Sequence, residues 1–140
     1  MALLVPNVGE ERMIRLIVNA TTAASTGENL KIRIFQSNTT PTSTMTLTDY
    51  TESTFTGYAA VTATSGSWTI TPGAPTSAQQ SAASTFSCTA TTSESAYGYY
   101  LSQENSSVLM WSERFSDGPY TIANNGDKII LTAQLTLSTT

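Results

Sequence analysis

Histidine is absent from the 140 residues of this chain, and cysteine occurs once, at Cys88. A Ser-His-Asp triad therefore has no base, and an intrachain disulfide has no second thiol. Metal sites built from histidine and cysteine are excluded for the same reason. A calcium site made of carboxylate and carbonyl oxygens stays open, although the spacing of an EF-hand loop is not present.

Charge is also scarce, because only 11% of the residues are charged and the net charge is −4. Four of the six basic residues fall in the first quarter of the sequence. Residues 36–140 carry two basic and seven acidic side chains. Proteins that bind nucleic acids without sequence preference need a basic stripe to neutralise phosphates. We therefore expect no nucleic-acid partner.

Long apolar runs are missing as well. The first six residues carry no basic side chain, and the apolar run 13–18 is short and interrupted by Arg15. We expect neither a signal peptide nor a membrane span. Three Asn-x-Ser/Thr sequons, at Asn19, Asn38 and Asn105, are about what this composition produces by chance and carry little weight.

The chain is instead rich in small hydroxyl residues, with 26 Thr and 18 Ser. Such a composition, poor in helix formers, favours strands and loops. A length of 140 residues suits one domain with its own core, and no change of composition marks a second domain. We therefore expect a single domain over residues 1–140.

Alternation of apolar and polar residues predicts the strands. It is clearest in 128–137, where Ile129, Leu131 and Ala133 alternate with polar neighbours, and it recurs in 97–101 and 108–115. Further strands are expected at 30–35, 67–71 and 85–90, with a turn leading into a strand at 50–61. Residues 78–84 have no apolar stripe and are expected to form a loop. In 85–90 Phe86 and Cys88 share a face, so Cys88 is expected to be a buried small hydrophobe.

Near the N-terminus, Asn7 and Glu10 have the spacing of a capping box. The residues that follow place an apolar face at helical spacing, which predicts a short helix; a strand over 13–18 is the alternative. Seven or eight short strands with one helix indicate an all-β protein, a β-sandwich with jelly-roll-like strand order.

Candidate catalytic groups are few. Three carboxylate pairs are close in sequence, but nothing makes them converge as acid and base catalysis requires: Glu10 with Glu11, Asp49 with Glu52, and Glu113 with Asp117. Serine has no Gly-x-Ser-x-Gly elbow, and a Ser-Lys pair would need Lys31 or Lys128, neither in a known motif. We predict no catalytic residue, no cofactor and no metal site.

The aromatic residues allow two interpretations. They could stack on sugar rings, or they could anchor the core and subunit interfaces, where Tyr and Trp are enriched; strand placement favours the second. The residues concerned are Tyr50, Phe55, Tyr58, Trp68, Tyr97, Tyr99, Tyr100, Trp111 and Tyr120.

Three stretches together resemble small virion proteins of tailed bacteriophages, of the head decoration or cement kind. They are residues 7–10 with the apolar segment after them, residues 30–35 leading to 48–59, and residues 97–100 with 111–120. The resemblance spans most of the chain. It implies a β-rich homotrimer on the outer surface of the virion head that bridges subunits of the major capsid protein.

The resemblance also directs attention to an interface. An arm over residues 1–7 has an apolar start that a monomer has little reason to expose, and the basic residues after it would complement an acidic capsid surface. The expected interface residues are Leu3, Leu4, Val5, Arg12, Arg15, Tyr58, Trp111 and Tyr120. Two alternatives remain: a tail-associated or carbohydrate-binding adhesion module, and a glycan or peptide hydrolase.

Overall fold

The computed structural model describes residue 14 and residues 29–42, 44–73, 76–105 and 108–137. These residues form eleven β-strands and one short 3-10 helix, which confirms the all-β prediction. Sandwich and jelly-roll order stay predictions. The expected N-terminal helix and the arm over residues 1–7 lie outside the described residues; Ile14, which is described, is fully buried.

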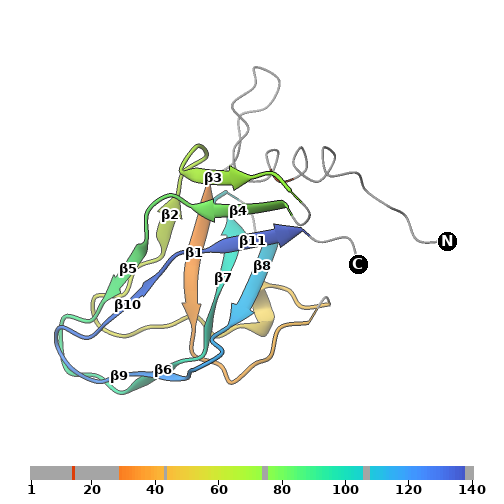
Figure 1. Cartoon of the computed structure of the whole chain (residues 1–140). Helices are drawn as coiled ribbons and strands as arrows, with labels where there is room; N and C mark the ends of the chain where they lie inside the picture. The colour runs from red at the N-terminus through yellow and green to blue at the C-terminus, as the bar shows by residue number, and fades with distance from the viewer. Residues whose placement is uncertain (1–13, 15–28, 43, 74–75, 106–107, 138–140) are drawn as a thin grey trace. The chain divides into compact units, whose positions relative to one another are not determined.

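The chain divides into two compact units, which we describe separately. The larger unit covers Leu30–Thr62 and Ser84–Ile130. Its centre is a four-stranded sheet in the order β2-β1-β7-β8 (Figure 1). The strands are β2 (Val61–Ala63), β1 (Leu30–Phe35), β7 (Gly98–Gln103) and β8 (Leu109–Arg114).

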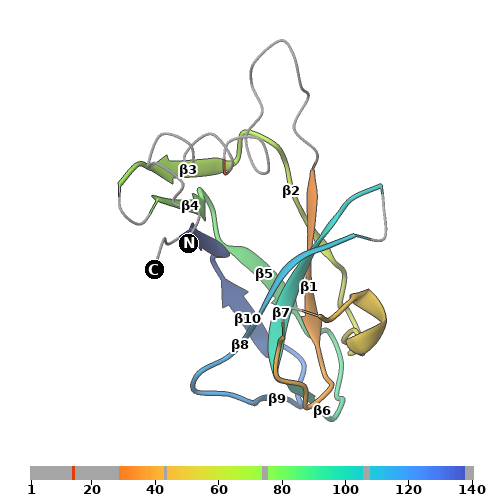
Figure 2. The ribbon, with the colours of Figure 1, turned by 90° about the vertical axis from the view of Figure 1, so that its right-hand side faces the viewer.

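Strand β1 has the alternation that its sequence predicts. Leu30, Ile32 and Ile34 are buried, and Ile32 lies opposite the equally buried Leu101 of β7 in the antiparallel ladder. On the other face, Arg33, Tyr100 and Ser112 are in register across β1, β7 and β8. A 3-10 helix, η1 (Leu47–Asp49), lies beside this sheet (Figure 2).

Two pairs of strands complete the larger unit. Strand β5 (Ser84–Ser87) pairs with β10 (Lys128–Leu131), and β6 (Glu94–Ala96) pairs with β9 (Tyr120–Ile122). The prediction for Cys88 is confirmed, since it is buried and its thiol lies 2.9 Å from the carbonyl oxygen of Ala90. Strands β6 and β9 were not predicted, because three residues are too few for a period to show.

The smaller unit includes a three-stranded sheet in the order β11-β4-β3. Its strands are β3 (Trp68–Thr71), β4 (Thr76–Gln80) and β11 (Gln134–Leu137). The prediction of a loop at 78–84 is wrong, since its first residues belong to the central strand β4. The inward residues of β4 are Thr76, Ala78 and Gln80, which do not form an apolar stripe in the sequence.

The expectation of one strand over 128–137 is also wrong. The chain leaves the strand conformation at Thr132 and Ala133, which separates β10 from β11. Each half pairs with a different strand, β10 with β5 and β11 with β4. Ala133 is fully buried, and its carbonyl oxygen accepts a hydrogen bond from the N–H of Gln80 at 2.9 Å. Alternation continues across a bend of this kind, so the pattern alone does not reveal it.

Candidate functional site

One face of the four-stranded sheet is built around the carboxylate of Glu52. The Tyr58 hydroxyl donates to Glu52 Oε1 at 2.8 Å, and the Tyr100 hydroxyl reaches Oε2 at 3.4 Å. Arg33 Nε lies 3.3 Å from the same Oε2, and its guanidinium also contacts Ser102 Oγ. Both carboxylate oxygens of Glu52 therefore have donors, and the charge is balanced by Arg33.

The two phenols beside Glu52 are held in their protonated form. Burial raises the pKa of Tyr58 well above its ordinary 10.0; the hydrogen bond from Ile34 N–H opposes this shift and Glu52 adds to it. Burial raises the pKa of Tyr100 to about 12, with a further contribution from the charge of Glu52. The two protonated phenols bond the carboxylate of Glu52, so this cluster fixes the segment of Glu52 onto the sheet.

Next to this cluster, three aromatic rings pack together. The ring centroid of Tyr50 lies 4.9 Å from that of Phe35 and 5.2 Å from that of Tyr100. The Tyr50 hydroxyl is hydrogen-bonded to Ser112 Oγ at 2.7 Å, and its oxygen is 3.4 Å from Met45 Sδ. Tyr50 thereby connects the segment before it to β8.

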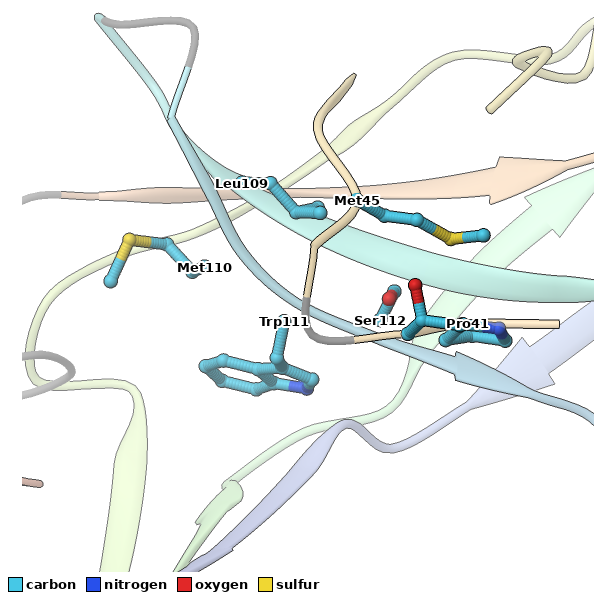
Figure 3. A pocket seen from close by; sticks show the side chains of 7 residues that line it. Pro41, Met45, Leu109, Met110, Trp111 and Ser112 are labelled. Carbon is cyan, nitrogen blue, oxygen red and sulfur yellow. The ribbon is translucent and has the colours of Figure 1, made fainter. Parts of the chain in front are cut away.

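A partly open groove of about 330 Å³ lies where this segment meets β8. Figure 3 shows that its walls come from β8 and from the loop that carries Pro41 and Met45. The residues that line it, the β8 groove from here on, are Pro41, Thr42, Met45, Leu109, Met110, Trp111 and Ser112.

Arg114, at the end of β8, holds the neighbouring loop. Its guanidinium donates to the carbonyl oxygen of Thr39 at 3.0 Å and to Asn38 Oδ1 at 2.7 Å. The same group stands 5.1 Å from the ring centroid of Tyr97, a cation–π distance. Arg114 is therefore occupied with positioning this loop.

The predicted interface residues are not brought together by the described structure. Tyr58 belongs to the Glu52 cluster, Trp111 lines the β8 groove, and Tyr120 is 37% exposed beside Phe115. The remaining five lie outside the described residues: Leu3, Leu4, Val5, Arg12 and Arg15.

The described carboxylate pairs have separate tasks. Asp49 accepts a hydrogen bond from Thr46 N–H at 2.7 Å, whereas Glu52 bonds the two phenols. Glu113 accepts a hydrogen bond from the Tyr99 hydroxyl at 2.5 Å, and Asp117 bonds the Tyr120 hydroxyl. Within the described ranges, no group of three or more His, Cys, Asp or Glu side chains could hold a metal ion.

Sequence reasoning singled out only Trp111 from the β8 groove. Its other apolar lining residues, Pro41, Met45, Leu109 and Met110, were not predicted as site residues. A usable signal was present, because residues 108–111 are four large apolar residues in a row. Such a run at a sheet edge marks a surface that could receive another chain.

Comparison with protein-family models, with curated proteins and with solved structures gives no significant match. The described residues contain no helix that is long and apolar enough to cross a membrane.

Proposed function

We propose that this chain is a structural virion protein: a decoration protein that binds the outer surface of a tailed-phage head. It bridges neighbouring subunits of the major capsid protein and assembles as a homotrimer. This role requires binding to the capsid and no catalysis.

The observation that carries the proposal is the position of the stretches that resemble decoration proteins, which lie together in one sheet. Residues 30–35 form β1, residues 97–100 lead into β7, and residues 111–114 belong to β8, so the three pair side by side in one sheet. Glu52, from the stretch 48–59, bonds side chains of β1 and β7. The stretches that resemble decoration proteins therefore belong to one packed sheet and the segment bound to it, which supports a shared structural role.

The surface of the larger unit also suits an attachment role. Val108 and Ile130 are 51% and 61% exposed, and Tyr120 adds an exposed ring. Contacts with other proteins commonly use contiguous apolar patches, and these exposed side chains are available to such a contact.

Binding to capsids tests the proposal. Expanded heads of a tailed phage, stripped of decoration proteins, are mixed with the purified chain and sedimented, and the free chain is sized by light scattering. We expect saturable co-sedimentation and a trimeric mass. A strictly monomeric chain that stays in the supernatant at every capsid concentration would contradict the proposal.

A carbohydrate-binding role is the second candidate, because the flat ring of Trp111 lines the β8 groove. The Phe115 and Tyr120 rings do not add a flat platform, since their planes are inclined by 60°. Binding on a glycan array that is lost in Trp111→Ala and kept in Tyr120→Ala would favour this candidate over capsid decoration.

A further inference from the structure

We propose that the open edge of β8 docks an extended peptide segment of a neighbouring protein. One bulky apolar side chain of that segment enters the β8 groove, and a basic residue beside it meets the acidic side chains that follow. This inference rests on the proposed function only for the identity of the neighbour, a subunit of the phage head.

The first support is the direction of the β8 backbone. Strand β8 is at the end of its sheet and pairs with β7 on one side. The N–H of Phe115 donates to the carbonyl oxygen of Tyr97 at 2.9 Å, and in an antiparallel ladder inward and outward bonding alternates by residue. Ser112 and Arg114 therefore turn their backbone N–H and C=O groups away from β7, at the spacing that an added strand requires.

The second support is that residues 108–111 contain no charged residue and no proline. Natural edge strands are commonly guarded by residues of these two kinds. Trp111 lies opposite Leu101 and Leu109 opposite Ser102, so Met110 is the extra residue of a β-bulge. Bulges re-aim side chains at sheet edges and next to binding sites. Here the bulge places Met110 in the wall of the groove.

The third support is the groove itself. Its volume of about 330 Å³ lies at the small end of ligand sites, which suits a single side chain and not a large cofactor. Met45 and Met110 contribute flexible thioethers, which adapt to apolar groups of different shape. Main-chain bonds to an edge combined with a side-chain pocket are the arrangement by which sheets bind extended peptides.

Charge indicates the chemistry of the partner. Glu113 and Asp117 are exposed at the end of β8. The cation between them, Arg114, is bonded to Asn38 and Thr39. The open charge here is negative, so the partner segment is basic.

A second copy of this chain fits that charge less well. In the part of the chain that the structure describes, Lys31 and Arg33 form ion pairs with Glu104 and Glu52. Together with the engaged Arg114, this leaves Lys128 as the one described cation without such a contact. The described residues of a second copy therefore offer little free positive charge, and the neighbour in this proposal is a different protein.

Peptide binding to the full chain tests the proposal. The probe is acetyl-Thr-Lys-Thr-Leu-Thr-Lys-Thr-amide, and its control carries Glu in place of Lys. We expect saturable binding in which the largest amide NMR shifts fall on β8, and at least about tenfold weaker binding of the acidic control at low salt, a difference that shrinks as salt is added. No shift along β8 at millimolar probe overturns the proposal, as does binding of a monosaccharide there in place of the peptide.

A matched pair of variants isolates the edge. Ser112→Pro removes an outward N–H without touching the β7 ladder, whereas Ser112→Ala removes only the hydroxyl and keeps that N–H. Both variants lack the hydroxyl that bonds Tyr50, so the comparison between them isolates the backbone N–H. We expect at least about tenfold weaker probe binding in Ser112→Pro than in Ser112→Ala. Equal binding by the two folded variants overturns the proposal. Should Ser112→Pro not fold, two N-methylated probes replace it, one methylated at the odd amide nitrogens and the other at the even ones. Only one of these sets faces the edge of β8, so methylation of that set should abolish binding and methylation of the other should not. Equal binding of the two probes overturns the proposal.

Capsid sedimentation of the same variants separates this inference from the proposed function. Capsid binding that survives in Ser112→Ala and is lost in Ser112→Pro supports both. Equal capsid binding by the two variants keeps the decoration role and overturns docking through β8. Probe binding along β8 without any binding to capsids keeps the edge site and overturns the decoration role.

Discussion

Strands β7 and β8 are neighbours of equal length in one sheet, and their burial is opposite. The first five residues of β7, Gly98 to Ser102, are all buried, whereas no residue of β8 is. Both strands carry aromatic, aliphatic and serine side chains. Position in the sheet, at the centre for β7 and at the edge for β8, therefore decides burial where composition does not.

Gly98 shows how closely the centre of this sheet is packed. A Cβ atom at Gly98 would lie 2.2 Å from the carbonyl oxygen of Glu113 and 2.5 Å from Cζ of Phe35. Only glycine leaves room for the Phe35 ring over β7 at this point. Strand β8 has the opposite property, since a groove of about 330 Å³ opens along it.

The largest expected effect is a direct test of this contrast. Leu101→Ala in β7 removes a fully buried side chain and should lower the free energy of unfolding by about 2–5 kcal/mol. Met110→Ala in β8 shortens a half-exposed side chain and should cost at most about 1 kcal/mol. Urea denaturation of both variants measures the two values. Equal losses would show that β8 is covered as thoroughly as β7.

Much of this contrast could be predicted from sequence, and its limits are physical. The period of two placed Leu30, Ile32 and Ile34 inward correctly, because one buried face imposes alternation. The strand β4 was missed because its buried residues are Thr, Ala and Gln. What buries them is pairing on both sides, with β3 and β11, and a local pattern does not contain that information.

The β8 groove was accessible to prediction only in part. The apolar run at 108–111 is visible in the sequence, but the bulge at Met110 and the position of Met45 opposite β8 depend on contacts distant along the chain. The hydrogen bond between Tyr50 and Ser112 joins residues 62 positions apart. Local alternation therefore predicts strands and does not predict which loop closes a groove over them.

A smaller effect is expected from the cluster around Glu52, which includes Arg33 and the phenols of Tyr58 and Tyr100. Glu52→Gln keeps the shape of the side chain but leaves Arg33 without its ion pair and weakens the bonds from two phenols, so we expect a loss of about 1–2 kcal/mol. The matched change on β8, Glu113→Gln, alters one bond to Tyr99 and should cost less than about 1 kcal/mol. Thermal unfolding ranks the two, and the reverse order would contradict a greater role of the central strand.

Alkaline pH should distinguish a buried phenol of β7 from an exposed one. The pKa of Tyr100 is raised from 10.0 to about 12, so the unfolded chain loses this proton first. Stability that is present below pH 10 is then lost as the pH rises toward 12. Tyr100→Phe should flatten this decline, whereas Tyr120→Phe, at a surface position, should change it less. Denaturant midpoints between pH 9 and 12 measure both slopes, and identical slopes would contradict the burial of Tyr100.

The smallest effect is expected at acid pH, from a half-buried carboxylate outside both strands. Asp127 Oδ2 accepts hydrogen bonds from the N–H groups of Ala123 and Asn124 at 2.9 and 2.8 Å, which lowers the pKa of Asp127 below 3.8. The unfolded chain therefore binds this proton first as the pH falls. The contribution of Asp127 is present above pH 3.8 and is lost below it. Asp127→Asn should remove that part of the acid dependence, measured by urea midpoints between pH 2 and 5. A variant as acid-sensitive as the parent would contradict a lowered pKa of Asp127 in the folded chain.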